Sequence, residues 1–367
     1  MRIYIDATFL IPGRVGGAEH MVANLVEGLA AVADAGDELI VVTDHPWSTS
    51  TRVGFTTPPA GPNRFVRASR AVARIGSRAD AILFTNYFTP PVLPRRTRTA
   101  TVIHDLQYRH HPDYFTRRKR AWLRFAHAVT LRRTGWVIAI SGSVRDDLLS
   151  AHGRRWARKI RTIWNPVSWS RFAGSDGAAA DVPTPYILTA AAHYPHKNLA
   201  TLIQAFEMLV RRGVDPDLHL VLAGQLGRDL RGVAWTPDIQ AQVEESGLRG
   251  KVTVTGYVSD ARLGELYRGA RLFAFPSLFE GFALPPVEAL GFGLPVLTTR
   301  RASIPEVTLK LARYVDDPLD PEAMALALER MWQDPSSHRP SPEDVERIRR
   351  TFDPSTIATR YLEVLKA

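Results

Sequence analysis

The sequence contains no cysteine, which excludes disulfide bonds, thiolate metal sites and a cysteine nucleophile. It contains no apolar run near the ~20 residues that span a bilayer, and residues 1–6 are typical of a strand rather than a signal peptide. Internal repeats and low-complexity tracts are absent too. With 45% hydrophobic and 23% charged residues, the 367-residue chain is instead typical of a globular protein with two domains.

Lysine is also scarce, at only 6 of the 47 basic residues, a bias that a GC-rich genome produces. That bias does not explain where the charge lies. Residues 1–170 hold 25 basic and 12 acidic side chains, whereas residues 171–367 hold 22 and 25, so the whole net charge of +10 comes from the first half. Only the first domain is therefore expected to meet an anionic partner.

Apolar runs and helical patterns alternate along the chain, which predicts an α/β fold with parallel sheets. A Gly-, Ala- and Pro-rich stretch, residues 174–185, interrupts this alternation, which then restarts. We therefore predict two Rossmann-like domains that face a cleft, residues 1–165 and 166–350. Strands are expected at 1–6, 39–43, 81–84, 101–103, 136–140, 186–190, 218–223, 252–255, 272–275 and 295–298. Helices are expected at 18–31, 117–133, 143–149, 199–211, 261–268 and 287–291.

The most specific pattern is the segment 275–296, in which a strand, a glycine loop and a helix start follow one another. The loop carries Glu280 and Gly281, and Glu288 lies in the expected first turn of the helix. Glycine lets backbone approach a ligand closely, and a helix N-terminus attracts phosphate. Two carboxylates at the carboxyl ends of strands suit the hydroxyls of a sugar or ribose, because an ionised acid accepts hydrogen bonds on both oxygens.

This segment resembles the Glu-x7-Glu signature of the GT-B retaining glycosyltransferases of family 4, including the surrounding Pro-Ser, Glu-Gly-Phe and Pro-Val residues. The resemblance implies that Glu280 binds the sugar hydroxyls of a nucleotide-sugar and that Glu288 holds its ribose. It also implies that Gly281 and Phe282 belong to this donor site. The resemblance covers nearly the whole chain, and it implies that residues 351–367 form a helix that crosses back to the first domain.

A second glycine-rich stretch, residues 13–17, follows the first expected strand. By the resemblance, the backbone amides of Gly16 and Gly17 would face the donor's pyrophosphate. The spacing Gly-x-x-Gly-Gly differs from the Gly-x-Gly-x-x-Gly of dinucleotide-binding dehydrogenases. A nicotinamide-dependent oxidoreductase nevertheless stays open as an alternative, because Asp44 follows the second strand, where such enzymes hold ribose.

Further motifs similar to those of the family lie at strand ends. The segment 101–106 is similar to the family's strand ending in His-Asp, which implies that His104 contacts the transferred sugar or the acceptor. The segment 195–199 is similar to Pro-Arg-Lys-Asn, and the ammonium of Lys197 would neutralise the leaving pyrophosphate. By the same resemblance, Gly224 belongs to a phosphate-side loop and Val258 contacts the nucleotide base.

The chain departs from the family just before Lys197. Many members carry an arginine there, whereas this chain has alanine at positions 190, 191 and 192. His193 and His196 are the candidates to supply the second positive charge. Ser141, in a loop similar to the family's serine loop, is expected only to cap a helix.

The residues 215–217 spell Asp-Pro-Asp, the metal motif of the other large glycosyltransferase fold. Proline and aspartate between a helix and a strand predict a turn instead. The histidines lack the spacing of metal ligands. We therefore predict no catalytic metal and no cofactor besides the nucleotide-sugar substrate.

The expected helix 117–133 is the most basic stretch of the chain. Its first turn carries Arg117, Arg118, Lys119 and Arg120. The apolar stripe expected to be buried consists of Trp122, Phe125, Ala126 and Val129. The polar faces are either a solvated surface or a surface for phospholipid head groups or a lipid-linked pyrophosphate acceptor. No aromatic-interleaved basic motif is present, so nucleic acid is not a predicted partner.

Together the motifs predict a retaining, metal-independent transferase of a hexose or deoxyhexose, most similar to mannosyl- and rhamnosyltransferases. The acceptor would be a saccharide, a lipid-linked saccharide or a secondary metabolite, held by the basic first domain. The predicted location is the cytoplasm, with that domain at the inner face of the cell membrane. The family's front-face pathway lets the leaving phosphate accept the acceptor's proton, so no protein nucleophile is assigned. The alternatives are a GT-B epimerase, a phosphorylase and a non-catalytic nucleotide-sugar binder.

Overall fold

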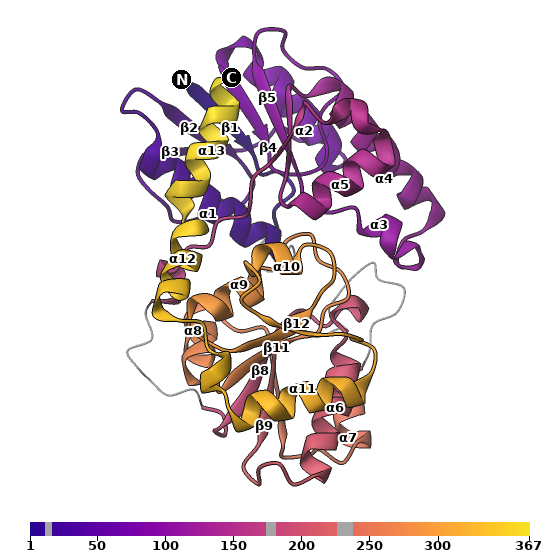
Figure 1. Cartoon of the computed structure of the whole chain (residues 1–367). Coiled ribbons are helices and arrows are strands. Elements are labelled where there is room, and N and C mark those ends of the chain that lie inside the picture. The colour runs from indigo at the N-terminus through magenta and orange to yellow at the C-terminus, as the bar shows by residue number, and fades with distance from the viewer. Residues whose placement is uncertain (12–16, 174–180, 226–237) are drawn as a thin grey trace. The chain divides into compact units, whose positions relative to one another are not determined.

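The computed structural model describes residues 1–11, 17–173, 181–225 and 238–367. The chain divides into two compact units, each built on one parallel sheet (Figure 1). Unit 1 comprises Met1–Pro112, Thr116–Ser168 and Arg350–Ala367, and unit 2 comprises Asp113–Phe115 and Trp169–Arg349. The prediction of two Rossmann-like α/β domains is therefore confirmed.

Unit 1 contains a seven-stranded sheet in the order β3-β2-β1-β4-β5-β6-β7, and every neighbouring pair is parallel. Its strands are β1 (Arg2–Asp6), β2 (Glu38–Val42), β3 (Val53–Thr56), β4 (Ala81–Phe84), β5 (Arg98–Ile103), β6 (Trp136–Ala139) and β7 (Ile160–Thr162). Because the chain winds from β1 to one side and later to the other, the topological switch point lies between β1 and β4. Doubly wound sheets bind ligands at the carboxyl ends of the strands at that point.

The helices of unit 1 include one from the end of the chain. They are α1 (Gly17–Val32), α2 (Arg64–Ile75), α3 (Gln107–His110), α4 (Arg117–Arg133), α5 (Gly142–His152) and α13 (Pro354–Lys366). Helix α13 packs on α1 so closely that a Cβ added at Gly28 would lie 2.1 Å from the carbonyl oxygen of Pro354. The C-terminal helix is thus part of unit 1 (Figure 1).

Unit 2 contains a six-stranded parallel sheet in the order β10-β9-β8-β11-β12-β13, with its switch point between β8 and β11. Its strands are β8 (Tyr186–Ala190), β9 (His219–Ala223), β10 (Val252–Gly256), β11 (Leu272–Phe275), β12 (Val296–Thr299) and β13 (Arg313–Val315). Its helices are α6 (Leu199–Arg211), α7 (Ile239–Glu245), α8 (Asp260–Gly269), α9 (Leu284–Gly291), α10 (Ile304–Val307) and α11 (Pro321–Gln333), and α12 (Pro342–Thr351) leads back to unit 1.

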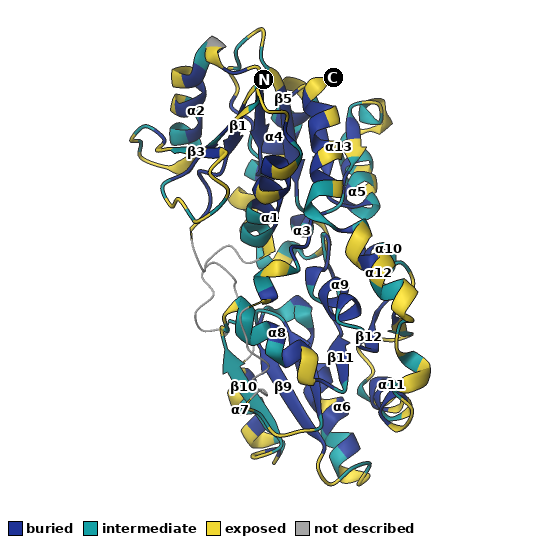
Figure 2. Cartoon of the chain, turned by 90° about the vertical axis from the view of Figure 1, so that its left-hand side faces the viewer, coloured by how far each residue is buried: buried dark blue, intermediate teal, exposed yellow. Residues whose placement is uncertain are grey.

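The central strands of both sheets are buried on both faces, as Figure 2 shows in dark blue. This burial explains why they are continuous apolar runs rather than alternating patterns. Among the described residues, every helix is too short or too polar to cross a bilayer.

Helix α4 has the predicted bounds but not the predicted buried face. The buried residues are Leu123, Ala126, His127, Thr130 and Leu131. Phe125, predicted to be buried, is 60% exposed. The prediction was wrong because the buried face of the helix includes two polar residues, His127 and Thr130. Thr130 can be buried because its hydroxyl donates to the Tyr87 carbonyl oxygen (2.8 Å).

Candidate active site

The two groups predicted to act on the sugar and the phosphate meet at the switch point of unit 2. Lys197 ends a short 3₁₀ turn after β8, and Glu280 lies in the loop after the neighbouring strand β11. Although 83 residues apart in sequence, Lys197 Nζ and Glu280 Oε1 are 2.5 Å apart. Their side chains are only 15% and 11% exposed, so the ion pair is largely shielded from water.

The two loops that carry this ion pair are tied together by hydrogen bonds. The Ser277 hydroxyl donates to Glu280 Oε1 (2.6 Å), and the Leu278 amide donates to the His196 carbonyl oxygen (2.8 Å). From the neighbouring strand end, the Ser303 hydroxyl donates to the carbonyl oxygen of Glu280 (3.0 Å). The orientation of the Glu280 carboxylate is therefore set by the fold before any ligand binds.

Asn198 fixes the start of helix α6 immediately after Lys197. Its backbone is left-handed (φ 57°), and its side-chain amide donates to the carbonyl oxygens of Pro318 (2.7 Å) and Pro276 (3.3 Å). Sequence reasoning assigned no role to Ser277, Ser303 or Asn198. Asn198 and Ser277 do lie within the motifs that were matched, so the motif positions were the available signal.

Glu288 is buried and fully engaged, with 3% of its surface exposed. The Arg171 guanidinium forms an ion pair with its Oε1, and the Tyr267 hydroxyl donates to Oε2 (2.9 Å). Burial, together with this carboxylate, raises the pKa of Tyr267 well above its ordinary value. Helix α9 begins at Leu284, so Glu288 lies in its second turn and not in the first turn as predicted. Each carboxylate oxygen still has a further lone pair for a ligand hydroxyl.

Arg171 was missed by the sequence reasoning. It lies 117 residues before Glu288, just after the division between the units, where no motif marks it. Its guanidinium packs over the Phe172 ring (4.3 Å to the centroid), and Nη1 lies 3.4 Å from Asp260 Oδ1. Arg171 therefore joins the segment after Ser168 to helices α8 and α9.

The predicted donor-site glycines fall in different surroundings. Gly16 lies outside the described residues, and Gly17 is the exposed first residue of α1 in unit 1. Gly224 (φ 144°) follows β9 and passes so close to the β8 loop that an added Cβ would lie 2.0 Å from the Ala191 carbonyl oxygen. Close backbone approach thus requires glycine at 224, whether or not a phosphate binds there.

The remaining predicted donor contacts lie in loops at the carboxyl ends of unit 2 strands. Gly281 is half-buried and Phe282 is buried, in the loop that carries Glu280. Val258 is half-buried between β10 and Ser259, which caps α8. Their roles toward a donor stay predictions.

His193 does not supply the positive charge that the missing arginine leaves open. It is 1% exposed, and burial lowers its pKa to about 4, so it is neutral at pH 7. The other candidate, His196, is buried and stacks on Tyr194, with ring centroids 5.6 Å apart.

His104 lies in unit 1, at the end of β5. Its Nε2 is 2.8 Å from the Thr85 carbonyl oxygen, so Nε2 bears a proton and donates it. Burial lowers the pKa of His104, and because Nε2 donates to Thr85, Nδ1 is the ring nitrogen that remains for another partner. The Thr85 hydroxyl in turn donates to the carbonyl oxygen of Asp6 (2.6 Å), so the ends of β1, β4 and β5 are linked.

Two further predictions about polar residues are confirmed. The segment 215–217 is a turn, in which Asp215 Oδ1 accepts from the Asp217 amide (2.9 Å) and Oδ2 accepts from Trp332 Nε1 (3.0 Å). Ser141 caps α5 by accepting from the Val144 amide (3.2 Å). Across the described ranges, no group of three His, Asp or Glu side chains could hold a metal ion.

Each half of the chain matches a family model of glycosyltransferases. Residues 15–171 match Glycosyltransferase Family 4, and residues 176–349 match Glycosyl transferases group 1. Among curated relatives, the O-antigen chain mannosyltransferase RfbU of Salmonella typhimurium is 26% identical over 74% of this chain and 69% of that protein. The O-antigen chain mannosyltransferase B of Escherichia coli is 28% identical over 68% of this chain and 65% of that protein.

Solved structures share the fold over the entire length of the chain. Sucrose-phosphate synthase from Thermosynechococcus elongatus has a TM-score of 0.80 at 21% identity and covers 100% of this chain and 98% of its own. Anabaena HepE in complex with UDP and glucose has a TM-score of 0.75 at 18% identity and covers 100% and 99%. With two matched glycosyltransferase models and two parallel-sheet domains of this topology, the chain is a glycosyltransferase of the GT-B fold.

Proposed function

We propose that the protein is a retaining, metal-independent hexosyltransferase of family 4 that takes its donor from a nucleotide-sugar. The observation that carries this proposal is the Lys197–Glu280 ion pair at the switch point of unit 2. A diphosphate leaving group develops negative charge, and a shielded, preorganised ammonium stabilises that charge more than a solvated one does.

The geometry supports separate roles for the two partners. Lys197 has three N–H donors, of which one is directed at Glu280, so two remain for phosphate oxygens. Glu280 Oε1 accepts from both Lys197 and Ser277, which leaves Oε2 for the hydroxyls of the sugar. In this proposal the leaving phosphate accepts the acceptor's proton, and no protein side chain becomes a nucleophile.

The buried Glu288, with a partner on each carboxylate oxygen, supports the proposed contact with the donor's ribose. Arg171 pairs with Oε1, and Tyr267 holds Oε2 in place. A vicinal diol could donate to the remaining lone pairs of both oxygens. Glu288 would thus hold the nucleotide while Glu280 holds the sugar.

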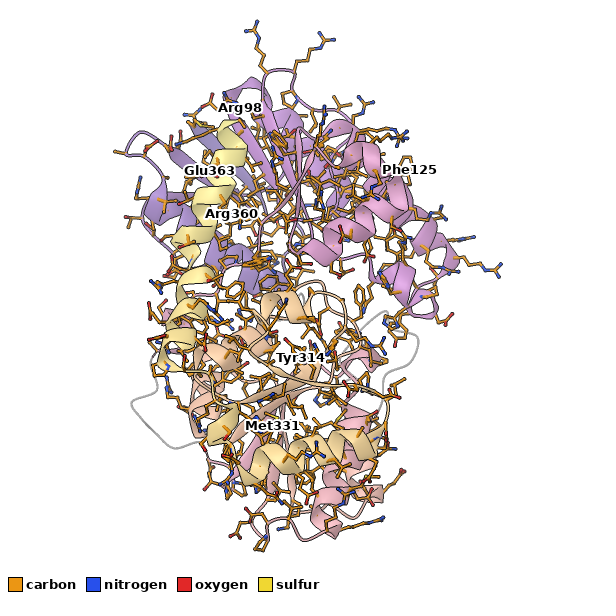
Figure 3. All side chains as sticks on the ribbon, viewed as in Figure 1. Arg98, Phe125, Tyr314, Met331, Arg360 and Glu363 are labelled. Atoms are coloured by element: carbon orange, nitrogen blue, oxygen red, sulfur yellow. The ribbon has the colours of Figure 1, made fainter. Side chains whose placement is uncertain are left out.

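The relatives support a mannosyl donor and a growing polysaccharide as acceptor, since two of them are O-antigen chain mannosyltransferases. We further propose that unit 1 holds the acceptor and docks on the anionic inner face of the membrane through α4. On that helix Phe125, which is labelled in Figure 3, is 60% exposed, and the exposed Arg117, Arg118 and Lys119 lie in its first turn. Exposed aromatic and cationic residues on one helix are typical of interfacial binding.

Nucleotide binding is the first test of the donor site. GDP, UDP, dTDP and ADP are each added to the purified protein, and the unfolding temperature is measured. We expect one nucleotide to raise it clearly more than the others. If none raises it at millimolar concentration, the proposed donor site is wrong.

Product analysis then tests the reaction itself. The nucleotide-sugar that matches the preferred base is incubated with a saccharide-diphospholipid acceptor, with and without EDTA. We expect the product linkage to have the same anomeric configuration as the donor. We also expect the same reaction rate with and without EDTA. An inverted linkage, or EDTA inhibition, contradicts retention or metal independence, and conversion of donor without acceptor indicates an epimerase.

Vesicle co-sedimentation tests the membrane part. We expect binding to phosphatidylglycerol vesicles at low salt, little binding to phosphatidylcholine vesicles, and weaker binding after Phe125→Ser or Arg118→Gln. Equal binding to both vesicle types would contradict an electrostatic surface.

A further inference from the structure

Unit 2 contains a hollow of about 540 Å³ beside the edge strand β13. Its wall is formed by β12, β13, the residues before β13, and helix α11. Two of its lining residues, Tyr314 on β13 and Met331 on α11, are labelled in Figure 3. Lys197, Glu280 and Glu288 are not among the lining residues, so the hollow is separate from the proposed donor site.

The hollow concentrates positive charge. Arg300, Lys310, Arg313 and Arg330 line it, and no Asp or Glu does. Within the described ranges, none of these four side chains forms an ion pair with a carboxylate. Four cations around one cavity repel one another, so an anion is the natural complement.

The remaining lining suits an organic anion rather than a bare ion. The Arg300 guanidinium lies over the Tyr314 ring, 4.5 Å from its centroid, and the Tyr314 hydroxyl is 2.8 Å from that of Thr308. Arg313 Nε donates to His338 Nδ1 (3.0 Å), so that ring accepts and adds no charge to the set. Leu297 and Met331 add an apolar floor for the carbon skeleton of a ligand.

The backbone that presents Lys310 is held in an unfavourable conformation. Leu309 (φ 49°) and Lys310 (φ 61°) are consecutive non-glycine residues in the left-handed region. Side chains with a Cβ rarely adopt it, and such residues concentrate at ligand sites. The Lys310 amide donates to the Pro305 carbonyl oxygen (3.2 Å), which closes this turn at the rim of the hollow.

From these four observations we propose that the hollow binds a small organic phosphate monoester, such as a sugar phosphate, at a second site. Its volume is within the range of small-molecule sites. Arginine forks bind phosphate oxygens in pairs, and lysine adds a point charge. The proposal does not depend on the donor site, and the two can fail separately.

The test is calorimetric titration of the full chain with glucose 6-phosphate at constant ionic strength. We expect saturable binding by the wild type and no binding of unphosphorylated glucose. The double variant Arg300→Gln, Lys310→Gln should weaken binding by at least about tenfold, because two charge-assisted contacts are lost. Both side chains are exposed, so we expect an unchanged unfolding temperature.

Two further variants separate this site from the donor site and from general charge. Lys197→Ala should leave the affinity unchanged, and so should the control Arg211→Gln, which removes an exposed charge that does not line the hollow. Equal affinity in the double variant, loss of binding in Lys197→Ala, or equal binding of glucose would each overturn the proposal. Absence of any binding by the wild type would overturn it as well, whatever the result for nucleotides.

Discussion

The two sheets reach their switch points with different chemistry. In unit 2, the strand ends of β8 and β11 bring together a shielded ammonium and a carboxylate, Lys197 and Glu280. In unit 1, the ends of β1, β4 and β5 are joined by hydrogen bonds to the backbone, from the Thr85 hydroxyl to the Asp6 carbonyl oxygen and from His104 Nε2 to the Thr85 carbonyl oxygen. The same architecture therefore provides a side-chain ion pair in one unit and hydrogen bonds to backbone carbonyl oxygens in the other.

The placed ammonium does not follow the net charge. The basic excess lies in residues 1–170, most of which belong to unit 1, whereas the Lys197–Glu280 ion pair lies in unit 2. A site that stabilises a leaving diphosphate needs a positive charge held in the right position, and it does not need a domain with a large positive net charge. Helix α4, the proposed membrane-docking surface, carries part of the excess of unit 1.

Removing the ammonium of unit 2 should have the largest effect. We expect Lys197→Ala to lower kcat by about 10²–10³-fold, since the leaving charge loses its preorganised partner. The control Lys251→Ala removes a lysine of the same unit whose ammonium donates to a backbone carbonyl. Steady-state kinetics are measured for both variants. Wild-type turnover in Lys197→Ala would contradict the proposed role of its ammonium.

The buried Arg171–Glu288 ion pair of unit 2 should contribute more to stability than a surface ion pair. We expect Glu288→Gln to lower the free energy of unfolding by about 3 kcal/mol, because Arg171 stays buried with an incomplete partner set. Nucleoside diphosphate affinity should fall about tenfold, since a charged acceptor for ribose becomes neutral. Glu265→Gln, in the i,i+3 pair with Arg262, should cost less than about 1 kcal/mol. If urea unfolding shows the same loss of unfolding free energy for Glu288→Gln and Glu265→Gln, the Arg171–Glu288 pair does not have the greater stabilising role.

Acid should weaken unit 2 through His193. Its pKa is lowered by burial from 6.5 to about 4 in the folded state, so between these values the unfolded chain binds the extra proton. Stability is therefore lost as the pH falls through this window, by about 3 kcal/mol at pH 4. His193→Asn should flatten the pH dependence of the unfolding free energy between pH 7 and 4. The control His45→Asn, at an exposed position, should leave the pH dependence as it is in the wild type. If His193→Asn also leaves it as it is, His193 is not the group responsible.

The His104 site of unit 1 should give the smallest effect. We expect His104→Asn to lower kcat/KM for the acceptor about tenfold. The substitution removes the imidazole ring, and with it the hydrogen bond to the Thr85 carbonyl oxygen and the Nδ1 acceptor. Nucleoside diphosphate affinity should be unchanged. A parallel loss of nucleotide affinity, measured by titration, would show that His104 serves the donor instead.

Local patterns were enough for elements with strong apolar or helical periodicity. The bounds of β4, β8, β11, α4 and α6 agree with the prediction, because each is a dense apolar run or a long helical pattern. Short or polar elements were missed, including β3, β7 and β13 at or near sheet edges, and the charged helices α2 and α12. Three or four residues give too few alternations to recognise a strand, and edge strands bury less apolar surface.

The candidate site was predictable only in part. Motif positions led to Lys197, Glu280 and Glu288, but not to Arg171, whose importance depends on a partner 117 residues away. The proposal that His193 replaces a cation was wrong, since its sequence neighbours do not reveal that the side chain is buried.

The fold as two parallel α/β domains, and the strand ends that hold polar residues, could be read from the sequence. Hydrophobic burial acts on local patterns, and these patterns consist of neighbouring residues. The contact of Lys197 with Glu280, the pairing of Arg171 with Glu288, and the four cations around one hollow became visible only in the folded chain. Such contacts depend on sheet order and loop packing, which place residues from distant parts of the chain within a few ångströms.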